Sequence, residues 1–418
     1  MNNKKQILKI CTGSKIASKS ISLASSEVKN NILKMVCSLL DKNRENIIGE
    51  NKIDVENALK SGLNSAKIDR LHLNNIRIDG IIKSIDDLIL LPDPVGKILY
   101  ETNLKNGLNI KRVSTPIGVL LAIYESRPNV TSDISALAIK SGNSVILRAG
   151  SDSILTSKAI ARIYQEAINH FSLDINIVNF IENNDRNFLK QLLQQDNLID
   201  VVIPRGGKDL INAISKQTKI PIFKHLDGNC HTYIHQDANL EKAKKILFNA
   251  KLRRVGICGA TESLLIDKKI AKEFLPKILN DLFACDCEIR GSKDVIKIDS
   301  RIKLAKEKDY YTEYLDKILS VKIVRNIEEA IEHISKYGSS HTESIITENK
   351  YMAQKFQNEV DSAIVMHNAS TQFADGNEFG LGGEVGIATG KLHARGPVGL
   401  EQLTTFKYKV YADCGLRK

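Results

Sequence analysis

Residues 118–150 read G-V-L-L-A-I-Y-E-S-R-P-N-V-T-S-D-I-S-A-L-A-I-K-S-G-N-S-V-I-L-R-A-G, and this stretch decides the fold. Its first seven residues form an apolar, strand-like run. A helical pattern then ends at Gly142, and a second apolar run ends at Gly150. Strand, helix and strand in alternation predict a parallel sheet with crossover helices, which is the α/β class.

The same alternation continues along the chain. Further short strands are predicted over 175–180, 199–204 and 220–225, with helical stretches between them. A second alternation begins near residue 231 with H-T-Y-I-H, and it includes a strand at 321–324 and helices at 239–252 and 327–338. The sequence therefore predicts two α/β regions in succession.

The two ends of the chain have different patterns. Apolar residues at three- and four-residue intervals predict helices over 22–42 and 68–91, and Pro92 ends this helical block. Near the C-terminus, residues 403–412 alternate β-branched or aromatic residues with charged ones. This alternation predicts an edge or arm strand, and terminal strands often serve an oligomer contact.

Composition narrows the functional classes. A chain of 418 residues is long enough for two or three domains, and its hydrophobic (42%) and charged (26%) contents are those of globular proteins. No long apolar run and no secretory leader pattern is seen, so we expect a soluble, cytoplasmic enzyme without membrane contact. The net charge of +11 invites a nucleic-acid interpretation, but acidic residues are interleaved with the basic ones and no nucleic-acid partner is predicted.

The seven cysteines do not form a recognisable framework. Their number is odd and their spacing irregular, which predicts reduced thiols and not disulfides. Cys285 and Cys287 are too close together for the usual zinc half-site, and no second pair of ligands follows. No metal is predicted.

Two thiols could carry chemistry. Cys258 lies in R-V-G-I-C-G-A-T, between glycines and just after Arg253 and Arg254, which suits a reachable and deprotonated nucleophile. Cys230 in H-L-D-G-N-C-H has His231 beside it, which suggests a Cys-His acyltransferase or amidase. A buried structural thiol is the commoner role of an isolated cysteine, so the residues alone leave all three interpretations open.

Other segments suggest where anions bind. Gly206 and Gly207 stand between a predicted strand and a helix N-terminus, where backbone N–H groups could approach a phosphate, although a tight turn explains them equally well. Arg148 follows a strand at the edge where open sheets bind ligands. The glycine-rich stretch 378–401 includes His393 and Arg395, which could meet anionic substrate groups.

Several strings in order point to a known family: Y-E-S-R-P-N-V, K-S-G-N-S-V-I-L-R-A-G, I-P-R-G-G, G-N-C-H, G-I-C-G-A-T-E, Y-G-S-S-H-T-E and L-H-A-R-G-P-V-G-L-E-Q-L-T-T-F-K-Y. Together they resemble the γ-glutamyl phosphate reductase family, also called glutamate-5-semialdehyde dehydrogenases, in the aldehyde dehydrogenase superfamily. The resemblance extends over essentially the whole chain. It implies a Rossmann-type cofactor domain, an α/β catalytic domain and a small β arm for oligomerisation.

The resemblance also implies residue roles. Cys258 falls on the catalytic cysteine of the superfamily, and Gly206 and Gly207 fall on the turn against the cofactor pyrophosphate. Arg148 takes the place of a lysine that contacts the adenosine ribose, and Glu313 matches the glutamate that holds the nicotinamide ribose. An arginine at position 148 is compatible with a 2′-phosphate, hence with NADP(H) as the cofactor.

Substrate contacts are implied less directly. Ser126 stands where typical aldehyde dehydrogenases have an oxyanion-hole asparagine. The donor to the oxyanion in this chain could therefore be Asn129 or backbone N–H groups. A substrate with phosphate and carboxylate charges needs cationic groups near Cys258. The candidates for these groups are Arg127, His341, His393 and Arg395.

The most informative departure is at His225. Ordinary aldehyde dehydrogenases have a glutamate there that activates water to hydrolyse the thioester, and this chain has none. Losing that base suits an acyl-enzyme that receives hydride or is cleaved by phosphate. The implied function is therefore NADPH-dependent reduction of L-glutamyl 5-phosphate to L-glutamate 5-semialdehyde, the second step of proline biosynthesis. A hydrolytic aldehyde dehydrogenase of other specificity is the alternative within the superfamily.

The implied domain boundaries are 1–103 and 118–227 for the cofactor domain, 228–399 for the catalytic domain, and 104–117 with 400–418 for the arm. We expect a homo-oligomer and a small-molecule substrate. Glutamate 5-kinase, as the upstream enzyme, is a possible protein partner.

Overall fold

The computed structural model describes residues 3–224 and 227–417, which fall into two compact units. Unit 1 contains Met1–His225, Gly380–Gly386 and Pro397–Lys418, and unit 2 contains Leu226–Phe379 and Ile387–Gly396. The chain therefore passes from unit 1 to unit 2, returns to unit 1 for Gly380–Gly386, and returns again from Pro397 after a second short passage through unit 2. The functions assigned to the ranges 1–103 with 118–227, 228–399 and 104–117 with 400–418 stay predictions.

Residues 3–90 of unit 1 are mostly helical, as the sequence predicts. The helices are α1 (Asn3–Leu23), α2 (Ser26–Lys42), α3 (Arg44–Lys60), α4 (Ser65–Leu71) and α5 (Asn75–Leu90). The single helix predicted over 68–91 is wrong, because the chain breaks into α4 and α5. Asn74 caps α5 by accepting from the Arg77 N–H, and buried Asn51 accepts from the Leu73 N–H between the two helices.

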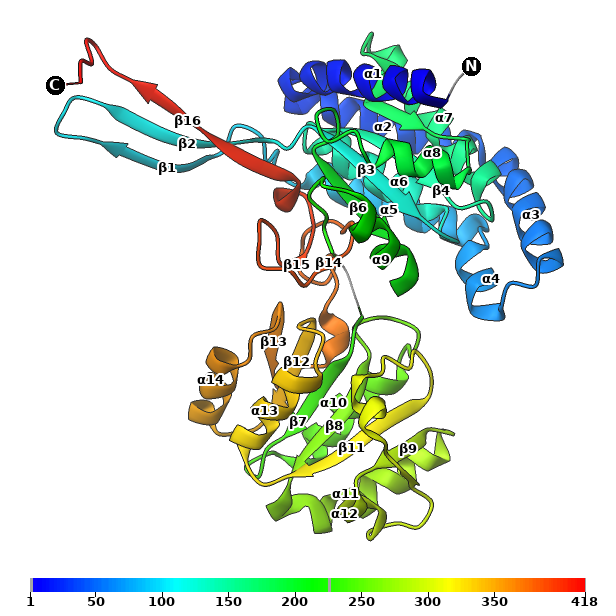
Figure 1. Cartoon of the computed structure of the whole chain (residues 1–418), viewed down its shortest axis with the longest axis vertical. Coiled ribbons are helices and arrows are strands. Elements are labelled where there is room, and N and C mark those ends of the chain that lie inside the picture. The colour runs from blue at the N-terminus through cyan, green and yellow to red at the C-terminus, as the bar shows by residue number, and fades with distance from the viewer. Residues whose placement is uncertain (1–2, 225–226, 418) are drawn as a thin grey trace. The chain divides into compact units, whose positions relative to one another are not determined.

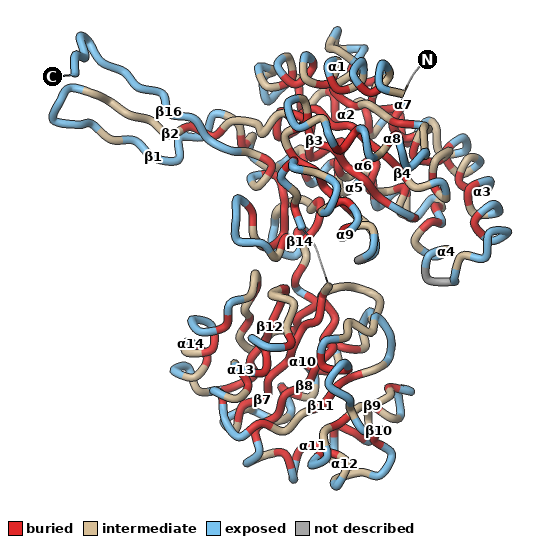
Figure 2. Tube along the Cα trace, viewed as in Figure 1, coloured by how far each residue is buried: buried red, intermediate tan, exposed pale blue. Residues whose placement is uncertain are grey.

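Unit 1 is built around a parallel four-stranded sheet, in agreement with the α/β prediction. Its strands β3 (Val119–Tyr124), β4 (Ser144–Ala149), β5 (Val178–Phe180) and β6 (Val201–Arg205) lie in the order β5-β4-β3-β6. The remaining helices are α6 (Asn129–Lys140), α7 (Ile154–His170), η1 (Ile175–Ile177), α8 (Arg186–Leu192), α9 (Lys208–Gln217) and η4 (Glu401–Leu403). Every residue of β3 and β4 is buried, as expected for a sheet covered on both faces (Figure 2).

The strand predicted over 220–225 is wrong as far as residue 224. Only an isolated bridge joins Ile222 to Val202, because Pro221 has no N–H to donate to a ladder. Residue 225 lies outside the described residues.

A separate antiparallel sheet of three strands belongs to unit 1. It contains β1 (Ile98–Asn103), β2 (Asn109–Pro116) and β16 (Thr404–Tyr411), in the order β1-β2-β16 (Figure 1). The terminal strand predicted at 403–412 is thus confirmed. Phe406, Tyr408 and Val410 are exposed on β16 although they are apolar or aromatic. Such a surface is typical of a segment that contacts another chain.

Unit 2 contains the second α/β region. Its parallel seven-stranded sheet has the order β10-β9-β11-β8-β7-β12-β13. The strands are β7 (Cys230–Ile234), β8 (Thr261–Asp267), β9 (Glu288–Gly291), β10 (Lys303–Leu304), β11 (Ile318–Val324), β12 (Thr342–Ile346) and β13 (Ile364–His367). The helices are α10 (Leu240–Leu252), α11 (Lys268–Ala284), α12 (Lys293–Ile296), η2 (Glu307–Tyr311), α13 (Ile327–Tyr337), α14 (Lys350–Glu359) and η3 (Thr371–Phe373). The glycine-rich segment adds the short strands β14 (Ile387–Ala388) and β15 (Gly396–Pro397).

Helices cover both faces of the unit 2 sheet. One apolar cluster joins it to α10 and α11 through residues such as Leu247 and Phe274, and another joins it to α13 and α14 through residues such as Ile334 and Phe356. Strands in the middle of the sheet, such as β8, are buried throughout. The amino ends of β7 and β8 are therefore held on a rigid base: Cys230 is the first residue of β7, and Cys258 lies in the loop before β8.

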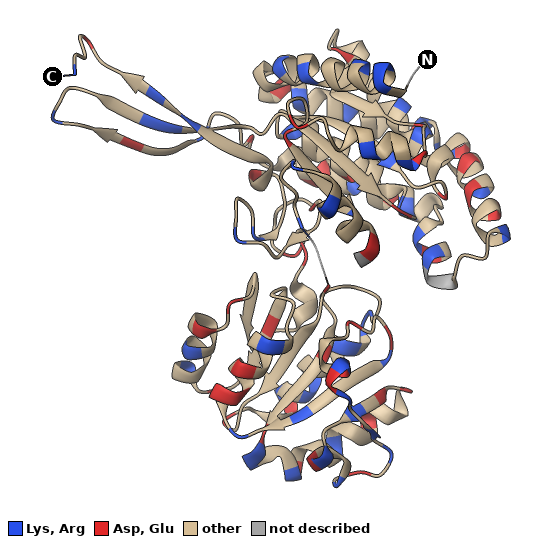
Figure 3. Cartoon of the chain, in the orientation of Figure 1, with Lys and Arg blue, Asp and Glu red and all other residues tan. Residues whose placement is uncertain are grey.

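The charged residues do not form a single block. Lys and Arg alternate with Asp and Glu along helices of both units (Figure 3). Among the described residues, no helix is both long and apolar enough to cross a membrane.

Candidate active site

Cys258 lies in the loop between α10 and β8 and is half-buried. A tight turn holds this loop, since the Ala260 N–H donates to the Ile257 carbonyl oxygen at 3.0 Å. Gly228 lies directly against the Cys258 backbone. A Cβ at position 228 would stand only 2.6 Å from both the Cα and the carbonyl carbon of Cys258. Only glycine fits at this close approach.

Cys230, the competing thiol, is fully buried in β7. Burial raises its pKa well above the ordinary value, and nearby carboxylates add to the shift. Its thiol donates to the Cys258 carbonyl oxygen, with 3.1 Å between Sγ and O. His231 Nδ1 lies 3.0 Å from Glu343 Oε2, and both side chains are also buried. Cys230 and His231 therefore form part of the core, and this geometry argues against a Cys-His hydrolase centred on them.

Glu313 approaches the same place from the loop after η2. Its Oε1 accepts from the Gly228 N–H at 2.9 Å, so Gly228 touches Cys258 on one side and Glu313 on the other. The structure thus brings together two of the residues predicted from sequence. Gly228 itself was missed, although the string D-G-N marked it as a backbone position with special freedom.

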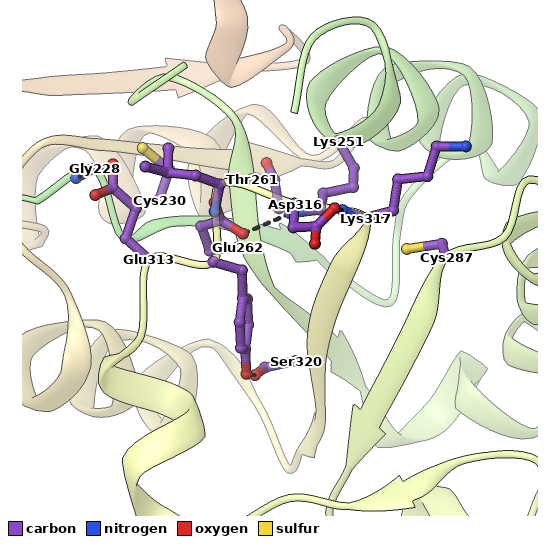
Figure 4. A network of polar contacts seen from close by, with 12 residues as sticks. Gly228, Cys230, Lys251, Thr261, Glu262, Cys287, Glu313, Asp316, Lys317 and Ser320 are labelled. Atoms are coloured by element: carbon purple, nitrogen blue, oxygen red, sulfur yellow. Dashed lines mark hydrogen bonds and ion pairs between the residues drawn. The ribbon is translucent and has the colours of Figure 1, made fainter. Parts of the chain in front are cut away.

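A buried ion pair lies next to this group and was also missed. Lys251 Nζ and Glu262 Oε2 are 2.5 Å apart, and both side chains are fully buried. Burial raises the pKa of Glu262 to about 7, and Lys251 opposes that shift. Figure 4 shows Glu262 between Lys251 and the loop of Glu313. No sequence signal distinguishes Lys251 from its lysine-rich helix.

The other predicted substrate residues of unit 2 differ in their surroundings. His341 is fully buried, and its Nδ1 lies 2.8 Å from Thr342 Oγ1 and 3.6 Å from Cys230 Sγ. Arg395 donates to both the side chain and the backbone carbonyl of Asp361, so its guanidinium is already engaged. His393 is exposed and has a positive φ of 65°.

Unit 1 gathers its own candidates at the carboxyl ends of β3, β4 and β6. In this sheet β4 and β5 follow β3 on one side, whereas β6 lies on the other side of β3. The strand order therefore reverses between β3 and β6. Open α/β sheets bind ligands at such a reversal. Gly206 and Gly207 lie there, at the start of α9.

Gly206 and Gly207 differ in the space around them. A Cβ on Gly206 would lie 2.6 Å from a methyl carbon of Leu210 and 2.9 Å from a carboxylate oxygen of Glu125, so a larger residue would have to displace these two side-chain ends. A Cβ on Gly207 would meet nothing within 4 Å. The N-terminus of α9 is therefore open to an anion, which its backbone N–H groups and dipole would favour. This arrangement fits the pyrophosphate of a dinucleotide.

Arg148 stands at the end of β4 and is almost completely buried. Its Nη2 donates to the Asn184 carbonyl oxygen at 3.0 Å, while its buried Nε has no hydrogen-bond partner within 3–224 and 227–417. Desolvation lowers the pKa of this guanidinium. A buried N–H without a partner is costly, and an acceptor on a ligand would satisfy it. Arg148 therefore also fits a cofactor with phosphate or hydroxyl groups.

The remaining candidates lie in the loop after β3. Ser126 has a positive φ of 49° and donates its hydroxyl proton to Asp152. Asn129 donates to Asp133 from its side-chain amide at 3.0 Å. Arg127, which follows Ser126 in the sequence, is half-buried. The roles of these residues, and of all the predicted site residues, stay predictions. In the described part of the chain, no three His, Cys, Asp or Glu side chains are grouped as a metal site requires.

Residues 1–287 match the model of the aldehyde dehydrogenase family. Gamma-glutamyl phosphate reductase from Brucella suis biovar 1 is 48% identical over 397 residues, which cover 95% of this chain and 94% of that protein. A crystal structure of gamma-glutamyl phosphate reductase from Thermotoga maritima matches with a TM-score of 0.96 and 43% identity, covering 99% of this chain and 100% of that one. Glyceraldehyde-3-phosphate dehydrogenase from Methanocaldococcus jannaschii, in complex with NADP, has a TM-score of 0.67 at 14% identity, covers 98% of this chain and 95% of that one, and shares the fold.

Proposed function

The chain belongs to the γ-glutamyl phosphate reductases of the aldehyde dehydrogenase family, and we propose that it reduces L-glutamyl 5-phosphate to L-glutamate 5-semialdehyde and phosphate with NADPH. This is the second step of proline biosynthesis from glutamate. The observation that carries the proposal is the contrast between the two thiols. Cys258 is half-buried in a glycine-flanked turn, and Gly228 joins this turn to Glu313, whereas Cys230 is fully buried with a raised pKa.

The reaction begins at Cys258. Its thiolate attacks the acyl carbon of the acyl phosphate, the bond to the phosphate oxygen breaks, and a thioester remains on Cys258. The reduced nicotinamide, when bound, supplies the hydride that this thioester needs. Collapse of the resulting thiohemiacetal expels the Cys258 thiolate and releases the aldehyde. The backbone of the turn, held by Gly228 and Cys230, keeps the sulfur in one place through both steps.

Water would waste the thioester. Position 225 carries histidine where other aldehyde dehydrogenases have a water-activating glutamate, although the placement of this residue lies outside the described residues. Without that base, we expect the thioester to be reduced by hydride, or cleaved by phosphate in the reverse direction, faster than it is hydrolysed. The hydrolytic alternative therefore has no observation in its favour.

The cofactor is a nicotinamide dinucleotide, as in the rest of the family, and we propose that it is NADP(H). Gly206, Gly207 and the start of α9 would hold the pyrophosphate, Arg148 the adenosine ribose with its 2′-phosphate, and Glu313 the nicotinamide ribose. Support comes from the open N-terminus of α9 and from the unsatisfied buried Nε of Arg148. The related fold from M. jannaschii binds NADP.

We assign the substrate anions to Arg127, His341, His393 and Arg395, and the oxyanion to Asn129, Ser126 or backbone N–H groups. Arg395 is already paired with Asp361, so it would act only by exchanging that partner or by shaping the loop. His341 is fully buried near Cys230, so we propose that it would affect the anion site by supporting the turn. We also propose that 1–103 with 118–227 binds the cofactor, that 228–399 carries the catalytic residues, and that 104–117 with 400–418 forms the oligomerisation arm.

Oligomerisation through the β1-β2-β16 sheet is part of the proposal. The exposed aromatic residues Phe406 and Tyr408 would be covered by a second copy of the chain. Replacing Tyr408 by aspartate should shift the chain toward monomer in sedimentation velocity. A kinase that forms the labile acyl phosphate must precede this enzyme, and glutamate 5-kinase is the expected supplier.

The decisive assay is reduction of NADP⁺ by glutamate 5-semialdehyde, followed at 340 nm with and without inorganic phosphate. Turnover should require phosphate, because phosphate is the acceptor that cleaves the thioester. Cys258→Ala should abolish this turnover and leave NADPH binding intact. Equal rates with and without phosphate, or substantial turnover in Cys258→Ala, would show the proposed reaction to be wrong.

A further inference from the structure

The buried ion pair between Lys251 and Glu262 is not needed to fill the core. Lys251 comes from the end of α10 and Glu262 from the start of β8, and neither side chain is exposed to solvent. Taking two charges out of water is costly, and an apolar pair of similar volume often stabilises a protein as well or better. The pair therefore requires a reason other than stability.

The second oxygen of Glu262 gives that reason. While Oε2 pairs with Lys251, Oε1 accepts from the Leu315 backbone N–H at 3.1 Å. Leu315 lies between η2 and β11 in residues 312–317, which form neither helix nor strand, and it has a positive φ of 53°. A non-glycine residue in this conformation is strained unless contacts hold it there. The buried carboxylate is one such contact.

The segment held in this way carries Glu313, two residues before Leu315. Glu313 in turn accepts from Gly228, which lies against Cys258. Cys258 is also joined to Glu262 along the chain, through Gly259, Ala260 and Thr261. Glu262 thus lies where the segment of Glu313 and the segment of Cys258 meet, as Figure 4 shows for Glu262, Glu313 and Gly228.

We propose that Glu262, oriented by Lys251, is a positioning residue: it fixes the loop 312–317 and thereby the place of Glu313 relative to Cys258. Lys251 restricts the carboxylate to one orientation, with one oxygen left for the loop. The inference rests on the proposed function in one respect, because its effect on NADPH binding assumes that Glu313 holds the nicotinamide ribose.

Two double variants test the proposal with a matched control. Lys251→Met with Glu262→Met removes the ion pair and the acceptor for the Leu315 N–H. Lys251→Met with Glu262→Gln also removes the ion pair but keeps a side-chain oxygen for that N–H. Neither leaves a single buried charge, so both should fold. They differ in the acceptor for the Leu315 N–H and in the side-chain amide N–H groups that the glutamine adds.

The Met/Met variant should bind NADPH roughly fivefold more weakly, as expected for the loss of one hydrogen bond. The amide of Leu315 should exchange with deuterium faster in the Met/Met variant than in the Met/Gln variant. The Met/Gln variant should recover part of the affinity, because an acceptor for the Leu315 N–H remains but Lys251 no longer orients it, and the two thermal midpoints should be similar. Equal NADPH affinity and equal Leu315 exchange in the two variants would overturn the proposal.

Hydrogen exchange of the unsubstituted chain is an independent test that needs no variant and no cofactor. The Leu315 amide should exchange at least roughly tenfold more slowly than the same amide in an unfolded peptide. Exchange at the unfolded rate would refute the contact with Glu262, even if the Met/Met variant did not fold. If Leu315 is protected and the variants differ in exchange while the unsubstituted chain fails to bind NADPH, the proposed function is wrong and the positioning role of Glu262 stands.

Discussion

Replacing Gly228 by alanine should disable the enzyme with little loss of folded protein. A Cβ at this position would be 2.6 Å from two backbone atoms of Cys258, whereas ordinary contact begins at 3.4 Å. The Cys258 carbonyl oxygen would be nearer still, so one of the two backbones must move by more than about 0.8 Å. If Cys258 moves, the nucleophile is displaced, and if residue 228 moves, its N–H is withdrawn from Glu313.

The size of the effect follows from this displacement. Misplacing reacting groups by ~1 Å can lower a rate roughly 10²-fold, so kcat/KM should fall by about that factor. Overpacking of a filled region costs about 1–3 kcal/mol, which leaves most of the chain folded. The phosphate-dependent reduction of NADP⁺ measures the rate, and urea unfolding measures the stability.

Two further measurements identify which backbone gives way. Slower alkylation of Cys258 by iodoacetamide would show that the thiol has moved, and weaker NADPH binding would show that Glu313 has lost its donor. Gly80→Ala is the matched control, since a Cβ there meets nothing within 4 Å and the residue lies inside α5. That change should stabilise the chain by about 0.5–1 kcal/mol without changing the rate. A Gly228→Ala enzyme with unaltered kcat/KM would refute the reasoning.

Other predictions concern the cofactor site, the second thiol and a buried histidine. Arg148→Met should weaken NADPH binding by roughly tenfold or more and NADH binding much less, measured by cofactor fluorescence, because only NADPH has a 2′-phosphate to accept from the guanidinium; an equal loss for both cofactors would contradict that assignment. Cys230→Ala should keep measurable, reduced turnover, while Cys258→Ala keeps none. Burial lowers the pKa of His333 from 6.5 to about 2, so this side chain stays neutral in the folded chain while the unfolded chain protonates it below pH 6.5. The stability that the neutral side chain contributes is therefore lost as the pH falls below 6.5. Relative to a His333→Phe variant, the free energy of unfolding of the unsubstituted chain should therefore fall by about 1.4 kcal/mol per pH unit between pH 6 and 4; parallel pH profiles would show that His333 is protonated in the folded chain.

The sequence predicts the sheet regions better than the contacts between loops. The alternation over 118–150 correctly predicts β3, α6 and β4, because a strand buried on both faces must be continuously apolar. The apolar run at 220–225 had the same appearance, yet one proline prevents the ladder there. A local pattern is thus sufficient to predict a helix or a strand, but it does not show which backbone N–H and C=O groups are hydrogen-bonded.

The active-site region shows the same limit. The small neighbours of Cys258 indicate a reachable thiol, and the family resemblance selects it over Cys230. Neither signal predicts that Gly228 lies against it, because the two segments are far apart in sequence and meet only in the fold. Lys251 and Glu262 look like surface residues in the sequence, since nothing local indicates that α10 and β8 enclose both charges.

The pairing of β16 with β2 has a consequence during synthesis of the protein. The edge of β2 from Asn109 to Pro116 receives its partner only after residues 117–403 have been translated. At ~5–20 residues per second this takes roughly 15–60 s, during which all of unit 2 is made and the edge of β2 stays open. An open edge is a template for pairing with another chain. Ribosomes that stall before residue 404 should therefore release chains that aggregate through β2, and this strand is the place where a chaperone would protect the unfinished protein.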